Sequence, residues 1–211
     1  MAGSAVVVDP PLKGEWAILN PPGHPRLAFD FLASQGSRLP YPGATFWRHV
    51  FGSITVDDTY AWKQPVFAPL DGVVVAAGDG MPDRHRISMV RDLVHLLRSR
   101  PKPGSPFAAY GGNYVILKCR DVYPLLAHLR CGSVLVRVGD AVRAGDLLGE
   151  VGNSGSSIQP HLHFQVMANA DPLPLFRNLV PFALRAARKR VGREWQQLSN
   201  ATVRNGDHLL L

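Results

Sequence analysis

Alternation between apolar and polar positions marks short strands along much of the chain. In residues 161–166 (His-Leu-His-Phe-Gln-Val), one face of a strand would carry His161, His163 and Gln165, and the other face three apolar side chains. The apolar face indicates that one side of this strand packs into a hydrophobic core. Two imidazoles on the opposite face suit a site where one binds a metal and the other handles protons, although a half-buried structural strand gives the same pattern.

Other strands are predicted between turns rich in glycine and aspartate. Residues 66–80 read as a hairpin around an Asp-Gly turn, and residues 139–155 carry Gly-Asp turns around short apolar strands. Strands this short and frequent favour a small sandwich or a curled antiparallel sheet. Further strands are expected at 111–118, 123–129 and 134–138.

Two segments depart from this strand pattern. Apolar residues recur at helical spacing between residues 86 and 100, before Pro101, and predict a short helical insertion around 81–110. A basic stretch near the C-terminus reads as a helical tail. We therefore expect a mainly β domain over 1–175 and a basic extension over 176–211, packed on the domain or trailing it. The basic residues of the tail are Arg185, Arg188, Lys189, Arg190 and Arg193.

Composition supports a folded core with many tight turns. The chain has 211 residues, of which 46% are hydrophobic and 18% charged, and it holds 20 glycines and 18 prolines. A chain of this length and hydrophobicity can bury a sizeable core, while the glycine and proline content favours turns between short strands over long helices.

Net charge and targeting signals give less information about where the protein acts than composition gives about its fold. A net charge of +7 predicts attraction to anionic surfaces without separating nucleic acid, wall polymer or lipid, and no nucleic-acid motif accompanies it. No secretory leader or membrane-spanning run is visible, so the chain as written is expected in the cytoplasm, or in the cell envelope if it is exported by another route or truncated at its start. Without an export signal, Cys119 and Cys131 favour free thiols over a disulfide.

Five motifs follow one another in a distinctive order along the chain. They are Asp30, Ala-Pro-x-Asp-Gly at 68–72, Ala127-His128-Leu129, the Gly-Asp repeats and Pro160-His161-Leu162-His163-Phe164. This order resembles the lysostaphin/LytM-type zinc metallopeptidases, from about residue 20 to about residue 170. The resemblance implies a mainly antiparallel β fold of the duplicated hybrid motif type. It also implies an endopeptidase that hydrolyses peptide bonds, usually in the cross-links of bacterial peptidoglycan.

The same resemblance implies a metal site and two assisting histidines. His24, Asp30 and His163 would hold one zinc ion per chain and leave a fourth position open for water. His128 and His161 would flank that water, take its proton and stabilise the charge that develops on the scissile carbonyl oxygen. Because these imidazoles act in their neutral form, activity is expected to fall at acidic pH.

The first motif departs from the family pattern. Three residues usually separate its histidine from its aspartate, whereas five separate His24 from Asp30, and Arg26 occupies the usual histidine position. A turn at Pro25 would bring His24 to the metal, and without it the site would keep only two protein ligands. Asp30 between Phe29 and Phe31 also has a structural interpretation, as a hydrogen-bonded aspartate in a buried strand.

Two other functions fit part of the pattern. A non-catalytic member of the family would bind peptidoglycan or regulate a wall hydrolase, but such members generally lose some of the aspartate and histidines that are present in this sequence. A biotinyl or lipoyl carrier domain shares the Gly-Asp hairpins but needs a lysine at a hairpin tip. That setting is absent around Lys63, Lys102 and Lys118.

Overall fold

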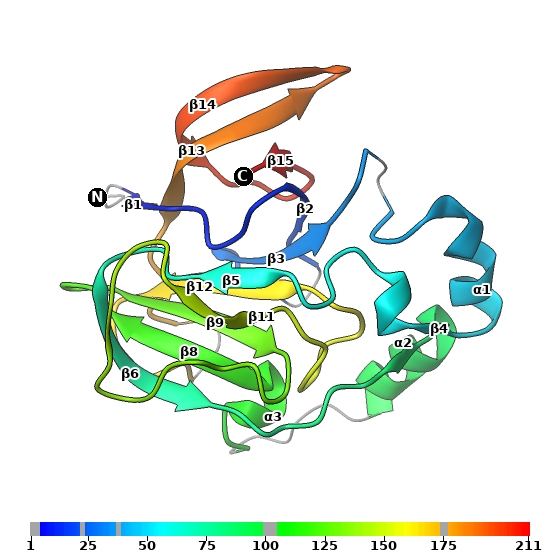
Figure 1. Cartoon of the computed structure of the whole chain (residues 1–211), viewed down its shortest axis with the longest axis horizontal. Helices are drawn as coiled ribbons and strands as arrows, with labels where there is room; N and C mark the ends of the chain where they lie inside the picture. Colours follow the sequence, from blue (N-terminus) through cyan, green and yellow to red (C-terminus); the bar gives the residue numbers. More distant parts are fainter. Residues whose placement is uncertain (1–4, 22–23, 37–38, 99–104, 174–176) are drawn as a thin grey trace.

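The computed structural model is built around one curled, largely antiparallel sheet, which confirms the mainly β fold class (Figure 1). The sheet runs in the order β1-β13-β15-β2-β3-β12-β9-β8-β6-β10, and β14 pairs with β13. Only β1 and β13 pair in parallel among the strands described. The structure describes residues 5–21, 24–36, 39–98, 105–173 and 177–211.

The strands of this sheet are short, apart from the C-terminal hairpin. They are β1 (Val6–Val8), β2 (Glu15–Leu19), β3 (Ala28–Ala33), β6 (Gly72–Gly78), β8 (Asn113–Lys118), β9 (Tyr123–Leu129), β10 (Ala141–Val142), β12 (Leu162–Met167), β13 (Phe182–Val191), β14 (Glu194–Thr202) and β15 (His208–Leu210).

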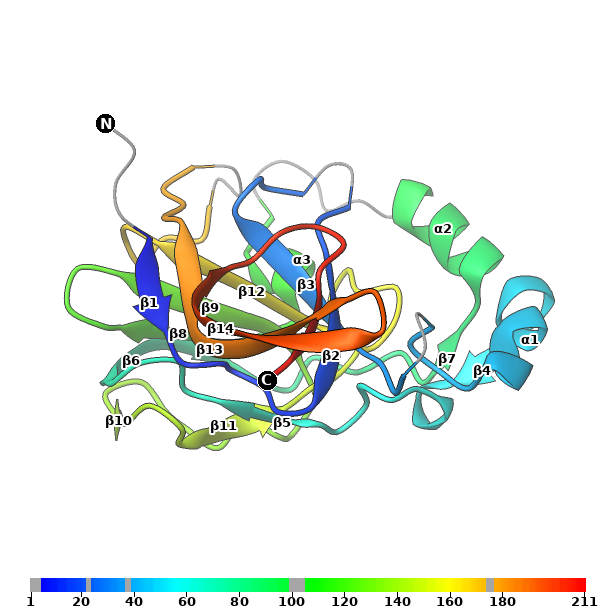
Figure 2. The same ribbon diagram turned by 90° about the horizontal axis from the view of Figure 1, so that it is seen from above.

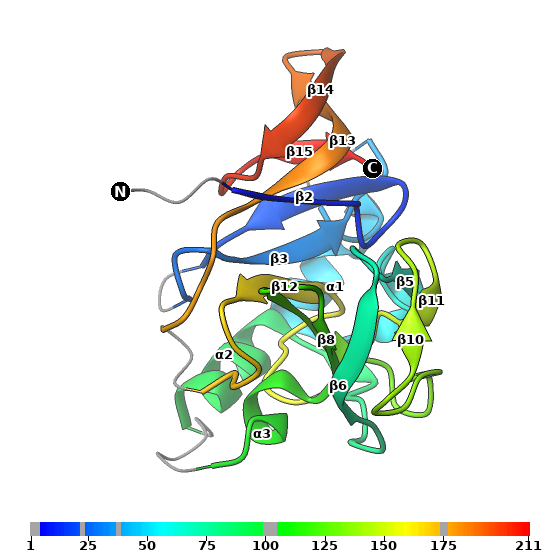
Figure 3. The same ribbon diagram turned by 90° about the vertical axis from the view of Figure 1, so that its left-hand side faces the viewer.

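Small elements flank the sheet. Figure 3 shows the β5–β11 pair on one side of it and the helices α2 and α3 on the other. The flanking elements are β4 (Ile54–Thr55) with β7 (Arg86–Ile87), β5 (Pro65–Phe67) with β11 (Leu147–Glu150), the helices α1 (Phe46–Phe51), α2 (Met89–Arg98) and α3 (Ala108–Gly111), and the 3-10 turns η1 (Gly43–Thr45) and η2 (Val56–Asp58).

The alternation predicted for residues 161–166 is present in β12. Leu162, Phe164 and Val166 are fully buried in the main core, which β5 and β11 cover from the far side. Apolar side chains of the opposite face form a smaller cluster that includes Ala127 and Met167. Because neighbouring residues of a strand point to opposite faces, His163 lies on the side of this smaller cluster.

The strand expected at 134–138 does not form. Val134 and Val136 pack against the main core while Leu135 and Val138 are exposed. The backbone N–H of Leu135 donates a hydrogen bond to the carbonyl of Leu148, but residues 134–138 do not form a strand and the segment is irregular.

The basic C-terminal tail is a set of strands, which corrects the predicted helix. Its alanine and arginine residues have good helix propensity, but Phe182 and Leu184 alternate into the main core and β13 pairs with β1, β14 and β15. Gly192, with φ of +63°, makes the turn to β14. Tertiary pairing outweighs local propensity in this segment. The domain boundary near residue 175 stays a prediction, although both sides of it contribute strands to one sheet.

The helical insertion is confirmed by α2, whereas Pro101 lies outside the described residues. Val90, Leu93 and Val94 lie on its surface and are exposed, so the periodicity marks the helix without marking a core. Figure 2 shows α1 and α2 side by side at one end of the molecule. No helix among the residues described is long and apolar enough to cross a membrane.

Both cysteines are free, as the sequence predicts. Cys119 is buried in the main core, and its burial together with the nearby Asp71 raises the pKa of its thiol to about 11.

Candidate metal centre

Strand register brings Asp30 and His163 together. β3 and β12 are antiparallel neighbours, and His163 lies directly opposite Asp30 in the ladder. Nδ1 of His163 is 3.0 Å from Oδ1 of Asp30. Phe29 and Phe31 point into the main core, so the carboxylate between them is directed to the opposite face, beside His163.

A clamped turn carries His24 to the same place. The backbone N–H of Ala28 donates to the carbonyl of Pro25, and the side-chain amide of Asn20 donates to both of those residues' carbonyl oxygens. The turn takes up the additional residues of the first motif, and Nε2 of His24 lies 3.5 Å from Oδ2 of Asp30. Ligand atoms of His24, Asp30 and His163 all lie within 4.8 Å of one another.

These three residues fit a zinc ion. Two ligands bound tetrahedrally at about 2.0–2.1 Å lie roughly 3.3 Å apart, and the 3.0 and 3.5 Å separations bracket that value. Nδ1 of His24 is buried and has no hydrogen-bond partner among the residues described. Burial lowers the pKa of His24 to about 4, despite the opposing effect of Asp30, so its imidazole is neutral and keeps a lone pair.

His161 stands beside this cluster. Its Nδ1 is 2.8 Å from the carbonyl oxygen of Gln159 and 3.1 Å from Oγ of Ser157, and its Nε2 is 3.5 Å from Oδ1 of Asp30. Because a carbonyl oxygen only accepts hydrogen bonds, Nδ1 carries the hydrogen and Nε2 faces the cluster.

His128 is held in the same way. Its Nδ1 donates to the carbonyl of Ser154 over 2.9 Å, and its ring centroid is 4.7 Å from that of His161 and 5.9 Å from that of His163. All five residues predicted for the site therefore lie in one cluster.

A β-bulge turns His128 toward that cluster. Asn113 pairs with Leu129 and Tyr114 pairs with Ala127, which leaves His128 as an extra residue with φ of +62°. A left-handed conformation at a residue other than glycine costs on the order of 1–3 kcal/mol, and a bulge of this kind redirects a side chain.

Several hydrogen bonds hold the bulge. Gly152 N–H donates to the carbonyl of His128, and the side chains of Asn113 and Ser154 both donate to the carbonyl of Leu129. Asn113 was missed in the sequence, because nothing in its local pattern reveals a partner that lies far along the chain.

Burial and mutual contacts shift the pKa values of the ionisable groups in the cluster. Burial alone would raise the pKa of Asp30, but the imidazoles of His161 and His163 hold it well below its usual range. Burial lowers the pKa of His128 strongly, and the neighbouring imidazoles add to this effect. For His161, burial acts in the same direction, but the Asp30 carboxylate outweighs it and raises the pKa. His128 is therefore neutral near pH 7.

The helical insertion supports the loop that precedes β12. The guanidinium of Arg84 donates to the carbonyl of Ser157 and to Oδ1 of Asp92, the latter over 2.8 Å. Asp83 accepts hydrogen bonds from the backbone N–H groups of Asn153 and Cys131. The segment before α2 thus fixes the loop that carries the partners of His128 and His161.

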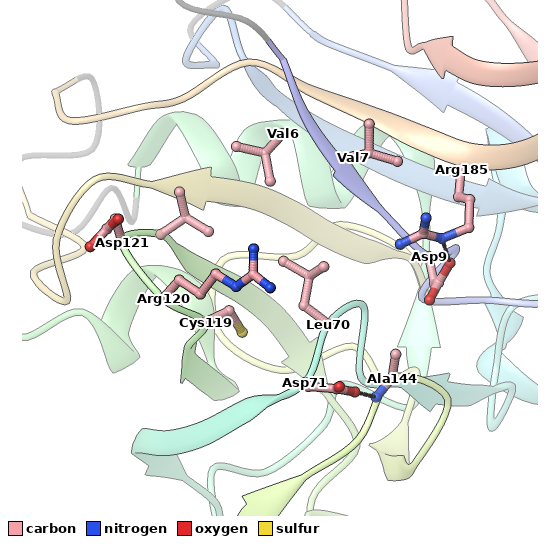
Figure 4. Close-up of a pocket in the computed structure, with 11 residues that line it drawn as sticks. Val6, Val7, Asp9, Leu70, Asp71, Cys119, Arg120, Asp121, Ala144 and Arg185 are labelled. Atoms are coloured by element: carbon pink, nitrogen blue, oxygen red, sulfur yellow. Dashed lines mark hydrogen bonds and ion pairs between the residues drawn. The ribbon is translucent and has the colours of Figure 1, made fainter.

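The cavity drawn in Figure 4 lies apart from this cluster. It has a volume of about 570 Å³ between β1, β13 and the turn after β8, and none of its lining residues belongs to the predicted site. Asp9 and Arg185, both among its lining residues, form an ion pair at 2.5 Å. We therefore place the candidate site at the histidine cluster.

Imidazole and carboxylate donors beside two further imidazoles are typical of a metal-dependent hydrolase. The sequence profile of Peptidase family M23 matches residues 55–174, more than half of the chain. The chain belongs to this family, which confirms the predicted resemblance. The match includes His128, His161 and His163 and begins after His24 and Asp30.

Relatives with known names match shorter segments. Peptidoglycan DD-endopeptidase ShyA of Vibrio cholerae is 29% identical over 82 residues, which cover 39% of this chain and 19% of the relative. Lysostaphin of Staphylococcus simulans is 36% identical over 75 residues, covering 32% and 15% respectively. The chain thus spans less than a fifth of the length of either relative.

Among solved structures, the catalytic domain of the antimicrobial peptidase lysostaphin from Staphylococcus simulans aligns with a TM-score of 0.41 and 22% identity. The alignment covers 78% of this chain and 92% of that domain.

Proposed function

We propose that the chain is a zinc-dependent endopeptidase that hydrolyses peptide bonds in peptidoglycan cross-links. The observation that carries this proposal is the convergence of His24, Asp30 and His163, whose ligand atoms all lie within 4.8 Å of one another. Relatives named as a peptidoglycan DD-endopeptidase and as lysostaphin support the substrate class. A net charge of +7 favours approach to an anionic wall polymer, and this function requires access to the cell envelope.

In this mechanism His24, Asp30 and His163 would hold one zinc ion per chain. The ion would supply Lewis acidity, which polarises the scissile carbonyl and makes water a better nucleophile at neutral pH. His128 and His161 each have Nδ1–H committed to a backbone carbonyl, which leaves Nε2 as a proton acceptor. One of them takes the proton of the attacking water.

The two imidazoles can act in turn. An imidazole that has gained a proton at Nε2 becomes a donor, and it can stabilise the negative charge on the scissile carbonyl oxygen or protonate the leaving nitrogen. Because His128 and His161 lie side by side near Asp30, both reach the same reacting group.

The first test is the metal content and activity of the wild type and of His24→Ala. We expect about one zinc per chain and digestion of purified peptidoglycan for the wild type, and loss of both in the variant, because two protein ligands hold zinc poorly. His85→Ala is the matched control, since His85 is exposed and packs beside Trp62. It should keep both zinc and activity.

A different pair of results would contradict the proposal. If metal-replete wild-type protein carries no zinc and binds peptidoglycan without cutting it, the chain is a non-catalytic member of the family. If His24→Ala keeps a full complement of zinc, His24 is not a ligand.

A further inference from the structure

Gln165 is a buried polar residue that the proposed mechanism does not use. It lies two residues after His163 on the same face of β12 and is only 1% exposed. Its Oε1 is 3.1 Å from Nε2 of His163. Backbone pairing with Ala28 of β3 and Leu125 of β9 fixes its position from both sides.

This contact determines which nitrogen of His163 carries a hydrogen. An amide oxygen only accepts hydrogen bonds, so Nε2 must be the N–H that donates to Gln165. A neutral imidazole then has its lone pair on Nδ1, which is the atom 3.0 Å from the Asp30 carboxylate. A cation between these two atoms, a proton in the metal-free protein or the metal ion in the loaded one, offsets their repulsion.

We infer that Gln165 is the positioning residue for the metal ligand His163. It fixes the tautomer and the ring orientation, so that Nδ1 faces the metal position formed with Asp30 and His24. The inference rests on the proposed function, because it concerns how this site holds its ion. Partners of this type typically change metal affinity by about 10- to 100-fold.

The three other histidines of the cluster differ from His163 in this respect. His128 and His161 use backbone carbonyls of Ser154 and Gln159 as acceptors, which side-chain substitutions leave in place. His24 has no partner on Nδ1 among the residues described. Among these four, His163 alone depends on a side-chain amide, so the inference can be tested by substitution.

The experiment compares zinc affinity in three variants. Gln165→Met removes the acceptor at similar volume, and Gln165→Glu keeps an oxygen acceptor at the same place. Gln197→Met is the control, because Gln197 is exposed on β14. Zinc dissociation constants would be measured by competition with a chromophoric chelator, and the melting temperature of each metal-free protein would report folding. We expect about 10- to 100-fold weaker binding for Gln165→Met, and wild-type affinity within a few-fold for the other two.

Nitrogen-15 NMR of the zinc-loaded wild type adds a readout that needs no variant. We expect the shifts of His163 to show zinc on Nδ1 and a hydrogen on Nε2, and zinc on Nε2 would overturn the inference even if Gln165→Met fails to fold. Equal zinc affinity for Gln165→Met and wild type would overturn it as well, and so would Gln165→Glu binding as weakly as Gln165→Met. Those results leave the proposed function standing, whereas a wild type that binds no zinc removes both.

Discussion

The two halves of the histidine cluster are built in different ways. Asp30 and His163 stand opposite each other in a ladder whose register is fixed by buried phenylalanines of β3 and β12. A slip of one residue would turn every side chain of the strand to the other face, so this register is strongly specified. We call this pair the strand half of the site.

The other half depends on loops. His128 sits at a bulge with positive φ, and His161 precedes β12. Each ring is held by a hydrogen bond to a backbone carbonyl, that of Ser154 for His128 and that of Gln159 for His161. We call these two histidines and the segment 151–161 the loop half. The comparison shows that sheet register places Asp30 and His163, whereas His128 and His161 need contacts from several distant segments.

The largest expected effect is a loss of activity without a loss of zinc, which would separate the functions of the two halves. His161→Ala should lower the rate of peptidoglycan digestion by roughly 100- to 10,000-fold, because it removes a proton acceptor. Zinc content should stay near one per chain, since the strand half and His24 are intact. Metal analysis of the same preparation used for the digestion assay checks both points. Loss of zinc together with activity would show that the halves are not independent.

A smaller effect should follow from crowding the loop half. A Cβ on Gly152 would come within 2.4 Å of the backbone of Arg130 and would push the end of β9 from the loop. Gly152→Ala should therefore lower the free energy of unfolding by about 1–3 kcal/mol, as measured by urea titration, and reduce activity. Gly43→Ala is the control, because nothing lies within 4 Å of the added atom. Equal stability of the two variants would contradict the close packing described.

The smallest expected effect is on stability and concerns His49, which lies next to the residues that hold the loop half in place. His49 is buried, and its Nδ1 shares a hydrogen bond with the hydroxyl group of Tyr41. It also lies near Asp92, which forms an ion pair with Arg84. Burial lowers the pKa of His49 in the folded protein, so the unfolded chain binds a proton first as pH falls. The stabilising contribution is complete above the ordinary histidine pKa of about 6.5 and is lost as pH falls below it.

The measurement is the free energy of unfolding at pH 7 and pH 5 for wild type and His49→Gln. We expect the wild type to lose more stability than the variant, by less than about 1 kcal/mol. The difference between the two proteins isolates His49 from the other buried histidines. An identical loss in both would mean that His49 titrates alike in the folded and unfolded states.

Sequence patterns predicted the strand half well. The alternation around Phe164 and the carboxylate between Phe29 and Phe31 depend on neighbours along the chain, so their faces are readable directly. The family resemblance implied all five candidate residues, and the structure brings them together, while their roles stay a prediction.

The remaining features depend on contacts between distant residues. The bulge at His128 requires Asn113 and Ser154, and the turn that places His24 requires Asn20. The C-terminal strands form because partner strands are available, against the helix propensity of their residues. Local composition has no signal for such partners, which is why the tail was predicted as a helix.

The place of β15 in the sheet has a consequence for synthesis on the ribosome. β15 lies between β13 and β2, so β2 gains its second neighbour only after His208–Leu210 have emerged. Until then β2, which pairs on its other side with the strand that carries Asp30, presents an open edge. Pairing over so long a sequence separation is slow, and the nascent chain would therefore depend on protection from aggregation until translation passes this strand.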